Sequence, residues 1–226
     1  MNGFLAANFS KLRDLPAGDY TRVMLILGND DPRFEEPAVL DAATRGVWEY
    51  IHARRTQLGE TSVYGYAFVP PTPFMLKDWE RYDVSRYVGV GCISPEEGRR
   101  SIPVSEHEVR YATIREDLEK LVAHVVHTGE SPVPHELERA VFLFHSPPYQ
   151  SRLDRAALDG CVIDHVPLDV HIGSIAIKEF IEQRQPLVTL HGHVHESAPL
   201  TTPSKVITRS SCSKSMFRPI GCRRWS

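Results

Sequence analysis

The stretch LVTLHGHVHES, Leu187 to Ser197, places a short apolar run directly before three histidines at alternate positions. An extended chain sends alternate side chains to one face, so we expect His191, His193 and His195 to point the same way. Imidazole is the commonest metal-ligating side chain, and converging imidazoles therefore indicate a metal site. The alternative is a solvated strand end that carries polar residues. Segments elsewhere in the chain bear on this choice.

Several other segments have the pattern of buried strands or amphipathic helices. The segment PPTPFMLKDWERYD contains prolines that forbid regular structure through about its first half. Apolar strands that alternate with helices predict an α/β fold. We expect strands at 21–27, 47–52, 61–69, 140–144 and from Leu187, and helices at 113–127 and from Gly173.

Residues that can bind a metal follow three of these expected strands. The Asn29-Asp30-Asp31 turn follows the first, His145 follows the strand at 140–144, and His193 and His195 follow the run from Leu187. Ligand sites in α/β proteins lie at the carboxyl ends of strands, where the loops converge. This placement favours a metal site over the solvated strand end.

The composition is that of one globular domain, with 226 residues, 42% apolar residues and a formal net charge of −3. Such a charge gives no global field that would recruit nucleic acid or an anionic membrane. No apolar run approaches the roughly 20 residues needed to cross a bilayer, and the first residues lack the pattern of a secretory signal. We therefore expect a cytoplasmic protein that has no membrane partner and does not bind nucleic acid.

Three motifs together resemble those of the calcineurin-like metallophosphoesterase superfamily. VMLILGNDDP resembles its GNH(D/E) motif, FLFHSPPY its strand with a lone histidine, and TLHGHVHES its closing GHxH. The segments VPPTPFMLKDWERYD and HIGSIAIKEFIEQRQPLVTLHGHVHES resemble an uncharacterised prokaryotic branch of that superfamily. The resemblance runs from Val23 to about Leu200 and predicts a phosphoesterase domain over residues 1–200.

The resemblance implies a double β-sandwich flanked by helices, an α/β/β/α arrangement, with two divalent metals at its edge. Asn29, His145 and His193 would hold the second metal, and His195 the first. An amide oxygen and imidazoles suit manganese, iron or zinc. Two cations roughly 3.5–4 Å apart activate a water for attack on phosphorus. The implied function is an enzyme that hydrolyses phosphomono- or phosphodiester bonds of a small substrate.

The chain departs from the family at its start. The family's D-x-H and the G-D with the metal-bridging aspartate belong well upstream of the GND motif. Only 27 residues precede Gly28, and they contain no D-x-H. We therefore expect a domain without its first strand or bridging carboxylate, which holds about one metal. The alternative function is a truncated or degenerate, catalytically inactive metal-binding module.

Asp30 stands where many relatives carry a histidine that contacts substrate and protonates the leaving group, which makes it the catalytic candidate. An aspartate beside two cations is expected to stay ionised and to be a poor general acid near neutrality. Leaving groups that need little protonation would then be favoured; alternatively, Asp30 only caps its turn.

Three further segments have other expected roles. We expect His191 to be a packing residue. His171 precedes the helix at Gly173-Ser174, so it could approach a phosphate at that helix N-terminus, or it is a loop histidine beside an N-cap serine. Residues 201–226 are basic, without acidic residues or periodicity, and are expected to form a disordered tail.

Overall fold

The computed structural model describes residues 2–15, 21–123, 136–194 and 206–208. Within these ranges the protein is a mixed α/β structure with several sheets and five α-helices. In this part of the chain no helix is long and apolar enough to cross a membrane.

The main sheet has five strands, of which the central three are parallel. The hairpin between its first two strands is antiparallel, and its last strand returns antiparallel to the fourth. The order is β3 (Arg54–Leu58), β4 (Thr61–Tyr66), β5 (Val141–Phe144), β8 (Val188–His191) and β9 (Val206–Thr208). The carboxyl ends of β4, β5 and β8 therefore lie at one edge.

One face of this sheet is aromatic and covered by helices. Tyr64 stacks on Phe142 of the neighbouring strand with ring centroids 4.7 Å apart. Phe180, from α5 (Ile175–Arg184), packs against the edge of Phe142 at 5.1 Å. Helix α4 (Ile114–Ala123) lies beside α5 and buries Ile114 and Leu118 completely or nearly so. These rings and aliphatic groups form the centre of the hydrophobic core.

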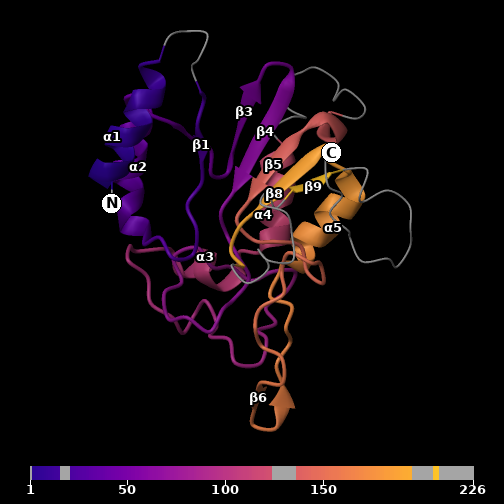
Figure 1. The fold of residues 1–226 in the computed structure, drawn as a ribbon. Helices are drawn as coiled ribbons and strands as arrows, with labels where there is room; N and C mark the ends of the chain where they lie inside the picture. The colour runs from indigo at the N-terminus through magenta and orange to yellow at the C-terminus, as the bar shows by residue number, and fades with distance from the viewer. Residues whose placement is uncertain (1, 16–20, 124–135, 195–205, 209–226) are drawn as a thin grey trace.

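A second, two-stranded sheet lies against the opposite face of the main sheet, where it contacts β4. Its strands, β1 (Met24–Leu25) and β2 (Glu49–Tyr50), are parallel. A side chain at Gly65 of β4 would place its Cβ 2.6 Å from the Ile51 carbonyl oxygen, so only glycine lets the two sheets approach this closely. Helices α1 (Asn2–Arg13) and α2 (Glu36–Thr44) flank β1 on the outside (Figure 1).

The strand expected at 21–27 is shorter than predicted and lies outside the main sheet. Its regular pairing is limited to Met24 and Leu25, which pair with β2 rather than with β5 or β8. A parallel bridge between His52 and Gly65 nevertheless gives β1 and β2 the direction of β4 and β5. Leu27 joins the same core as Phe142, so the expected common core and common strand direction are present.

The remaining described elements are short. They are η1 (Arg33–Glu35), α3 (Glu106–Tyr111), η2 (Leu137–Arg139) and the antiparallel pair β6 (Val162–Ile163) and β7 (Val166–Pro167). Between 67 and 105 the chain forms no helix and no named strand. The prolines predicted this only for about the first half of the segment 70–83, and the strand expected at 61–69 ends at Tyr66. Buried Trp79 anchors this segment by donating to the Asp31 carbonyl at 2.8 Å.

The segment predicted as a disordered tail contributes one strand. Val206–Thr208 forms β9 and pairs with Val188, Thr189 and Leu190 of β8. The expectation of disorder is therefore wrong for these three residues, because the open edge of β8 offers unpaired backbone groups that a passing segment can satisfy. The rest of the predicted tail lies outside the described residues.

Candidate metal centre

Three of the predicted ligands converge where their strands end. The amide oxygen Oδ1 of Asn29 lies 2.8 Å from His145 Nε2 and 2.8 Å from His193 Nδ1. The two imidazole rings meet edge to face with centroids 5.3 Å apart. Asn29 follows β1, His145 directly follows β5, and His193 lies two residues beyond β8. We call these residues the Asn29–His145–His193 cluster; Asn29 itself is buried.

Two glycines make room for the ring of His145. A methyl group on Gly28 would lie 2.5 Å from His145 Cε1 and 2.7 Å from Nε2, closer than real contacts allow. One on Gly192 would lie 3.1 Å from His145 Nδ1. The imidazole therefore packs directly against the backbone of both neighbouring turns. Sequence reasoning missed this role, although a glycine next to each ligand motif was visible.

The first two of the three alternate histidines, His191 and His193, do not share a face. Strand β8 ends at His191, and His193 has a φ of +70°, in the left-handed region that non-glycine residues rarely adopt. The backbone turn directs His193 to Asn29, whereas His191 stacks on Phe144 with ring centroids 5.6 Å apart. The expectation of a common face is therefore wrong for these two, because the strand conformation stops before His193. His195 lies outside the described residues.

The contacts of His191 fit the packing role expected for it. This residue is buried, and its Nε2 and Nδ1 lie 2.8 Å from Thr189 Oγ1 and 3.0 Å from the Ser146 carbonyl oxygen. Both ring nitrogens thus face protein groups away from the Asn29–His145–His193 cluster.

The turn after β1 is closed by Asp31 rather than by Asp30. One carboxylate oxygen of Asp31 accepts from the Gly28 N–H at 2.8 Å, and the Asp31 N–H donates to the Gly28 carbonyl at 3.0 Å. Asp30 is exposed, and its carboxylate accepts only a long 3.4 Å contact from the Asn29 amide. The capping role considered for Asp30 thus belongs to its neighbour, and the Asp30 side chain lies beside the cluster and open to solvent.

The N-terminus of α5 is already occupied by a carboxylate. Asp83 accepts from the backbone N–H groups of Ile175 at 2.7 Å and Ala176 at 3.2 Å, and from the Ser174 hydroxyl at 2.6 Å. His171 is held 2.9 Å from the buried Asp154 through Nδ1. A phosphate would have to displace Asp83 from this position, so the structure favours the loop-histidine alternative for His171.

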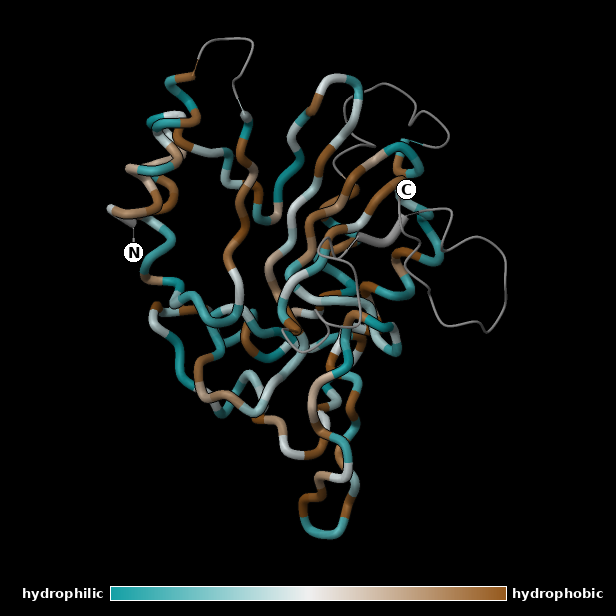
Figure 2. Tube along the Cα trace, viewed as in Figure 1, coloured by the Kyte–Doolittle hydropathy of each residue, from teal (hydrophilic) through white to brown (hydrophobic). Residues whose placement is uncertain are grey.

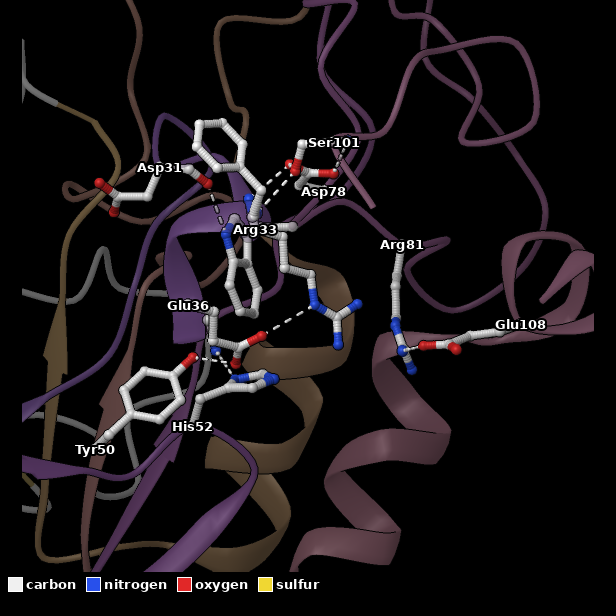
Figure 3. Close-up of polar contacts among 12 residues, drawn as sticks. Asp31, Arg33, Glu36, Tyr50, His52, Asp78, Arg81, Ser101 and Glu108 are labelled. Carbon is white, nitrogen blue, oxygen red and sulfur yellow. Dashed lines mark hydrogen bonds and ion pairs between the residues drawn. The ribbon is translucent and has the colours of Figure 1, made fainter. Parts of the chain in front are cut away.

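A second polar cluster surrounds buried His52, on the side of the molecule shown in Figure 3. The guanidinium groups of Arg33 and Arg81 both lie near the Phe68 ring, with Cζ 6.0 and 4.0 Å from its centroid. Burial, and then the charges of Arg33, Arg81 and Arg54, lower the pKa of His52 to about 3. Sequence analysis did not find this cluster, because its members come from segments that have no motif in common.

The cations of this second cluster already have counter-ions. Arg81 pairs with Asp117 at 2.7 Å and with Glu108, and Lys77, which is fully buried, pairs with Glu80 at 2.5 Å. Arg33 reaches Glu36 at 3.4 Å. A shallow pocket opens between these groups. The cluster therefore acts as a compensated ionic network that fixes the segment 67–105 against α4.

The donor set of the Asn29–His145–His193 cluster suits a divalent transition metal. Ligand atoms about 2.0–2.2 Å from one cation lie roughly 3 Å from each other, and two of the distances between these donor atoms are 2.8 Å. Within the described ranges, no three or more His, Cys, Asp or Glu side chains form a group that could hold a metal. The cluster has two imidazoles and an amide, so any metal here needs further ligands to balance its charge.

Comparisons with known proteins add little. No family model matches the chain, and neither does any curated protein. One solved structure aligns with 85% of this chain and 59% of its own length, at 18% sequence identity and a TM-score of 0.44. The chain thus spans less than two thirds of that structure, and a likeness of this degree carries no argument about fold or function.

Proposed function

We propose that this protein is a metal-dependent phosphoesterase of the calcineurin-like type, acting on phosphomono- or phosphodiester bonds of a small substrate. The observation that carries the proposal is the convergence of Asn29 Oδ1 on His145 Nε2 and His193 Nδ1. Asn29 lies more than a hundred positions before either histidine in sequence. Each of the three residues belongs to a motif that resembles that superfamily.

The arrangement of layers supports the finer fold assignment. Helices α4 and α5 cover one face of the main sheet, the β1–β2 pair lies beyond its other face, and α1 and α2 lie outside that pair (Figure 1). This arrangement supports an α/β/β/α sandwich in which, among the described residues, one of the two sheets has two strands. We propose that the protein is a reduced form of the superfamily's double β-sandwich.

The residues of the cluster have distinct roles in the proposed reaction. Asn29, His145 and His193 would hold a manganese, iron or zinc ion, with His195 as a further ligand. A bound metal of this kind lowers the pKa of its water and stabilises charge on phosphoryl oxygens. Asp30, exposed beside Asn29, would contact the leaving group in this proposal, which would favour substrates whose leaving group needs no proton.

The test is metal binding and turnover by the purified chain. Manganese and zinc titrations should give about one metal per chain, and Asn29→Ala, His145→Ala and His193→Ala should each weaken binding by at least about tenfold, because each removes one of the proposed ligands. His165→Ala, which changes an exposed histidine of the β6–β7 turn, is the matched control and should bind like the wild type. Hydrolysis of bis(p-nitrophenyl) phosphate should be stimulated by manganese and lost with the same three variants.

The second candidate is a metal-binding module without turnover. The specific observation that favours it is that, among the described residues, no carboxylate joins these imidazoles in a metal-binding group. Two neighbouring cations without an anionic bridge repel strongly. Metal binding that depends on the cluster, with phosphodiester hydrolysis equal to that of the His193→Ala variant, would select this alternative. Equal metal binding by the wild type and all three variants would contradict both candidates.

A further inference from the structure

A two-stranded ribbon projects from the body of the protein. We call residues 155–171 the β6–β7 ribbon; Figure 1 shows it extending beyond the sheets and helices. Its two arms are joined by the β6–β7 pairing, by an N–H···O bond from Leu168 to Cys161 at 2.9 Å and by a bridge between Arg155 and His171. Among the described residues no strand pairs with either outer edge. Both edges therefore present free backbone donors and acceptors.

Apolar side chains are concentrated near the tip of this ribbon. Val162, Ile163 and Val166 are 58%, 40% and 45% exposed, and Figure 2 shows hydrophobic positions there. The ribbon also touches the loop around Gly91, where an added Cβ would lie 2.7 Å from Ile163 Cδ1. That loop contributes the exposed Tyr87 and Val90. The ribbon and the loop together form an apolar surface of a kind that soluble proteins usually cover.

Two unpaired charges lie at opposite ends of the ribbon. Arg152 is exposed just before its base and Asp164 is exposed at its tip. Neither forms a hydrogen bond or ion pair with another residue in the described part of the chain, whereas Arg155 and Asp159 pair with each other and Asp169 accepts from Tyr149 at 2.6 Å. Arg152 at the base and Asp164 at the tip are therefore free to form ion pairs with another molecule.

We propose that the β6–β7 ribbon is a dimerisation arm that docks against the same ribbon of a second copy of this chain, in antiparallel orientation. A two-fold axis across the arms brings the tip of each ribbon to the base of the other, so Arg152 faces the partner's Asp164 twice. One open edge of each ribbon pairs with that of the other, so the face of Ile163 and Val166 and the opposite face of Val162 both continue across the joined ribbons. Each contact is made in duplicate, as two-fold symmetry requires.

A second copy fits this surface because the surface is complementary to itself. The cation and the anion stand at opposite ends of one arm, so only an antiparallel arrangement of identical arms satisfies both. An isolated two-stranded ribbon is marginally stable in water, and the second copy would extend it to four strands with an apolar face. The ribbon and the adjoining loop at 87–91 together offer the exposed apolar side chains for such a contact.

The first experiment measures the oligomeric state of the full chain by sedimentation velocity between about 1 and 100 µM. The wild type is expected to be a dimer over most of this range, and Val162→Lys with Val166→Lys should weaken dimerisation by at least about tenfold. Leu58→Lys, at a residue 50% exposed on β3, is the matched control and should not weaken it. All these positions are exposed, so circular dichroism and melting curves should match. A monomeric wild type, or a dimer that the ribbon variant leaves intact, would overturn the proposal.

The second experiment tests the antiparallel orientation by exchanging the two charges. Arg152→Asp and Asp164→Arg should each weaken dimerisation by about fivefold or more, because each places two like-charged pairs across the two-fold axis. The double variant restores opposite charges and should return to within about twofold of the wild type. Failure of the double variant to recover, with both single variants weakened, would overturn the proposed orientation. These measurements need neither metal nor substrate, so their outcome does not depend on the proposed phosphoesterase activity.

Discussion

At the scale of single residues, the position of His145 depends on the absence of a methyl group. Its imidazole lies where a Cβ on Gly28 would be, 2.5 Å from Cε1. The sequence motifs predicted that Asn29, His145 and His193 would meet, because each follows a strand whose carboxyl end lies at one edge. They could not predict that Asp31 closes the turn or that His193 leaves the strand conformation at a φ of +70°. The sequence places Asp30 and Asp31 in the same turn without distinguishing which one closes it. The contact of His193 with Asn29 joins two turns that share no local sequence signature.

Replacement of Gly28 by alanine should therefore weaken metal binding without removing a ligand. The added methyl group pushes His145 away from Asn29, and we expect manganese affinity to fall by about tenfold, with a loss of stability of about 1–3 kcal/mol from local overpacking. Gly3→Ala is the control, because nothing lies within 4 Å of its added Cβ. Calorimetric titration and urea unfolding measure the two effects. Unchanged affinity in Gly28→Ala would mean that His145 does not bind the metal in the position described.

At the scale of elements, helix α5 shows which N-terminal capping contacts can be predicted from sequence and which cannot. The helix was predicted from the apolar spacing after Gly173 and from Ser174 at its start. Ser174 does cap the helix, because its hydroxyl accepts from the Ile177 N–H at 3.0 Å. The remaining N–H groups of the first turn are satisfied by Asp83, which is more than ninety positions earlier in the chain. No local sequence pattern predicts a capping residue that is so far away in the chain. Helices α1 and α2 and strand β3 were likewise not predicted from the sequence.

Removal of the distant cap should destabilise the protein measurably. Asp83→Ala leaves the Ile175 and Ala176 N–H groups unpaired in a largely buried position, which should cost about 1–3 kcal/mol of unfolding free energy. Ser105→Ala, at the exposed N-cap of α3, removes a single bond from the Glu108 N–H and should cost less than about 1 kcal/mol. Urea titrations of both variants provide the comparison. Equal costs at the two sites would contradict the assignment of Asp83 as the principal cap of α5.

At the scale of the whole molecule, the strand directions and the edge that carries the ligands followed from sequence, whereas the contacts between layers did not. The parallel order of β4, β5 and β8 is what alternating strands and helices predict. The ionic network that joins the segment 67–105 to α4 depends on Arg81 reaching Asp117 and Glu108, and such pairs form only after the chain has folded. The same network surrounds His52, which lies edge-on to Trp79 at 4.9 Å and whose Nδ1 accepts from the Ala67 N–H at 3.1 Å.

The buried His52 should make the stability of the whole protein depend on pH. Burial first, and the nearby arginines second, lower its pKa to about 3, whereas an unfolded histidine has a pKa near 6.5. Below about pH 6.5 the His52 imidazole therefore binds a proton in the unfolded chain but not in the folded protein. This contribution to stability is fully present above that pH and is lost as the pH falls, by about 2 kcal/mol at pH 5.

The His52→Asn variant isolates this effect, because the asparagine amide oxygen can accept from the Ala67 N–H but does not titrate. Other groups titrate in both proteins, so the informative quantity is the difference in unfolding free energy between wild type and variant, measured in urea at intervals from pH 7.5 to pH 5. We expect the advantage of the wild type to shrink by about 2 kcal/mol over this range. A difference that stays constant would mean that His52 is protonated in the folded protein, with its charge balanced by the carboxylates of the network. If the stability advantage of the wild type grows at low pH instead, the pKa of His52 must be higher in the folded protein than in the unfolded chain.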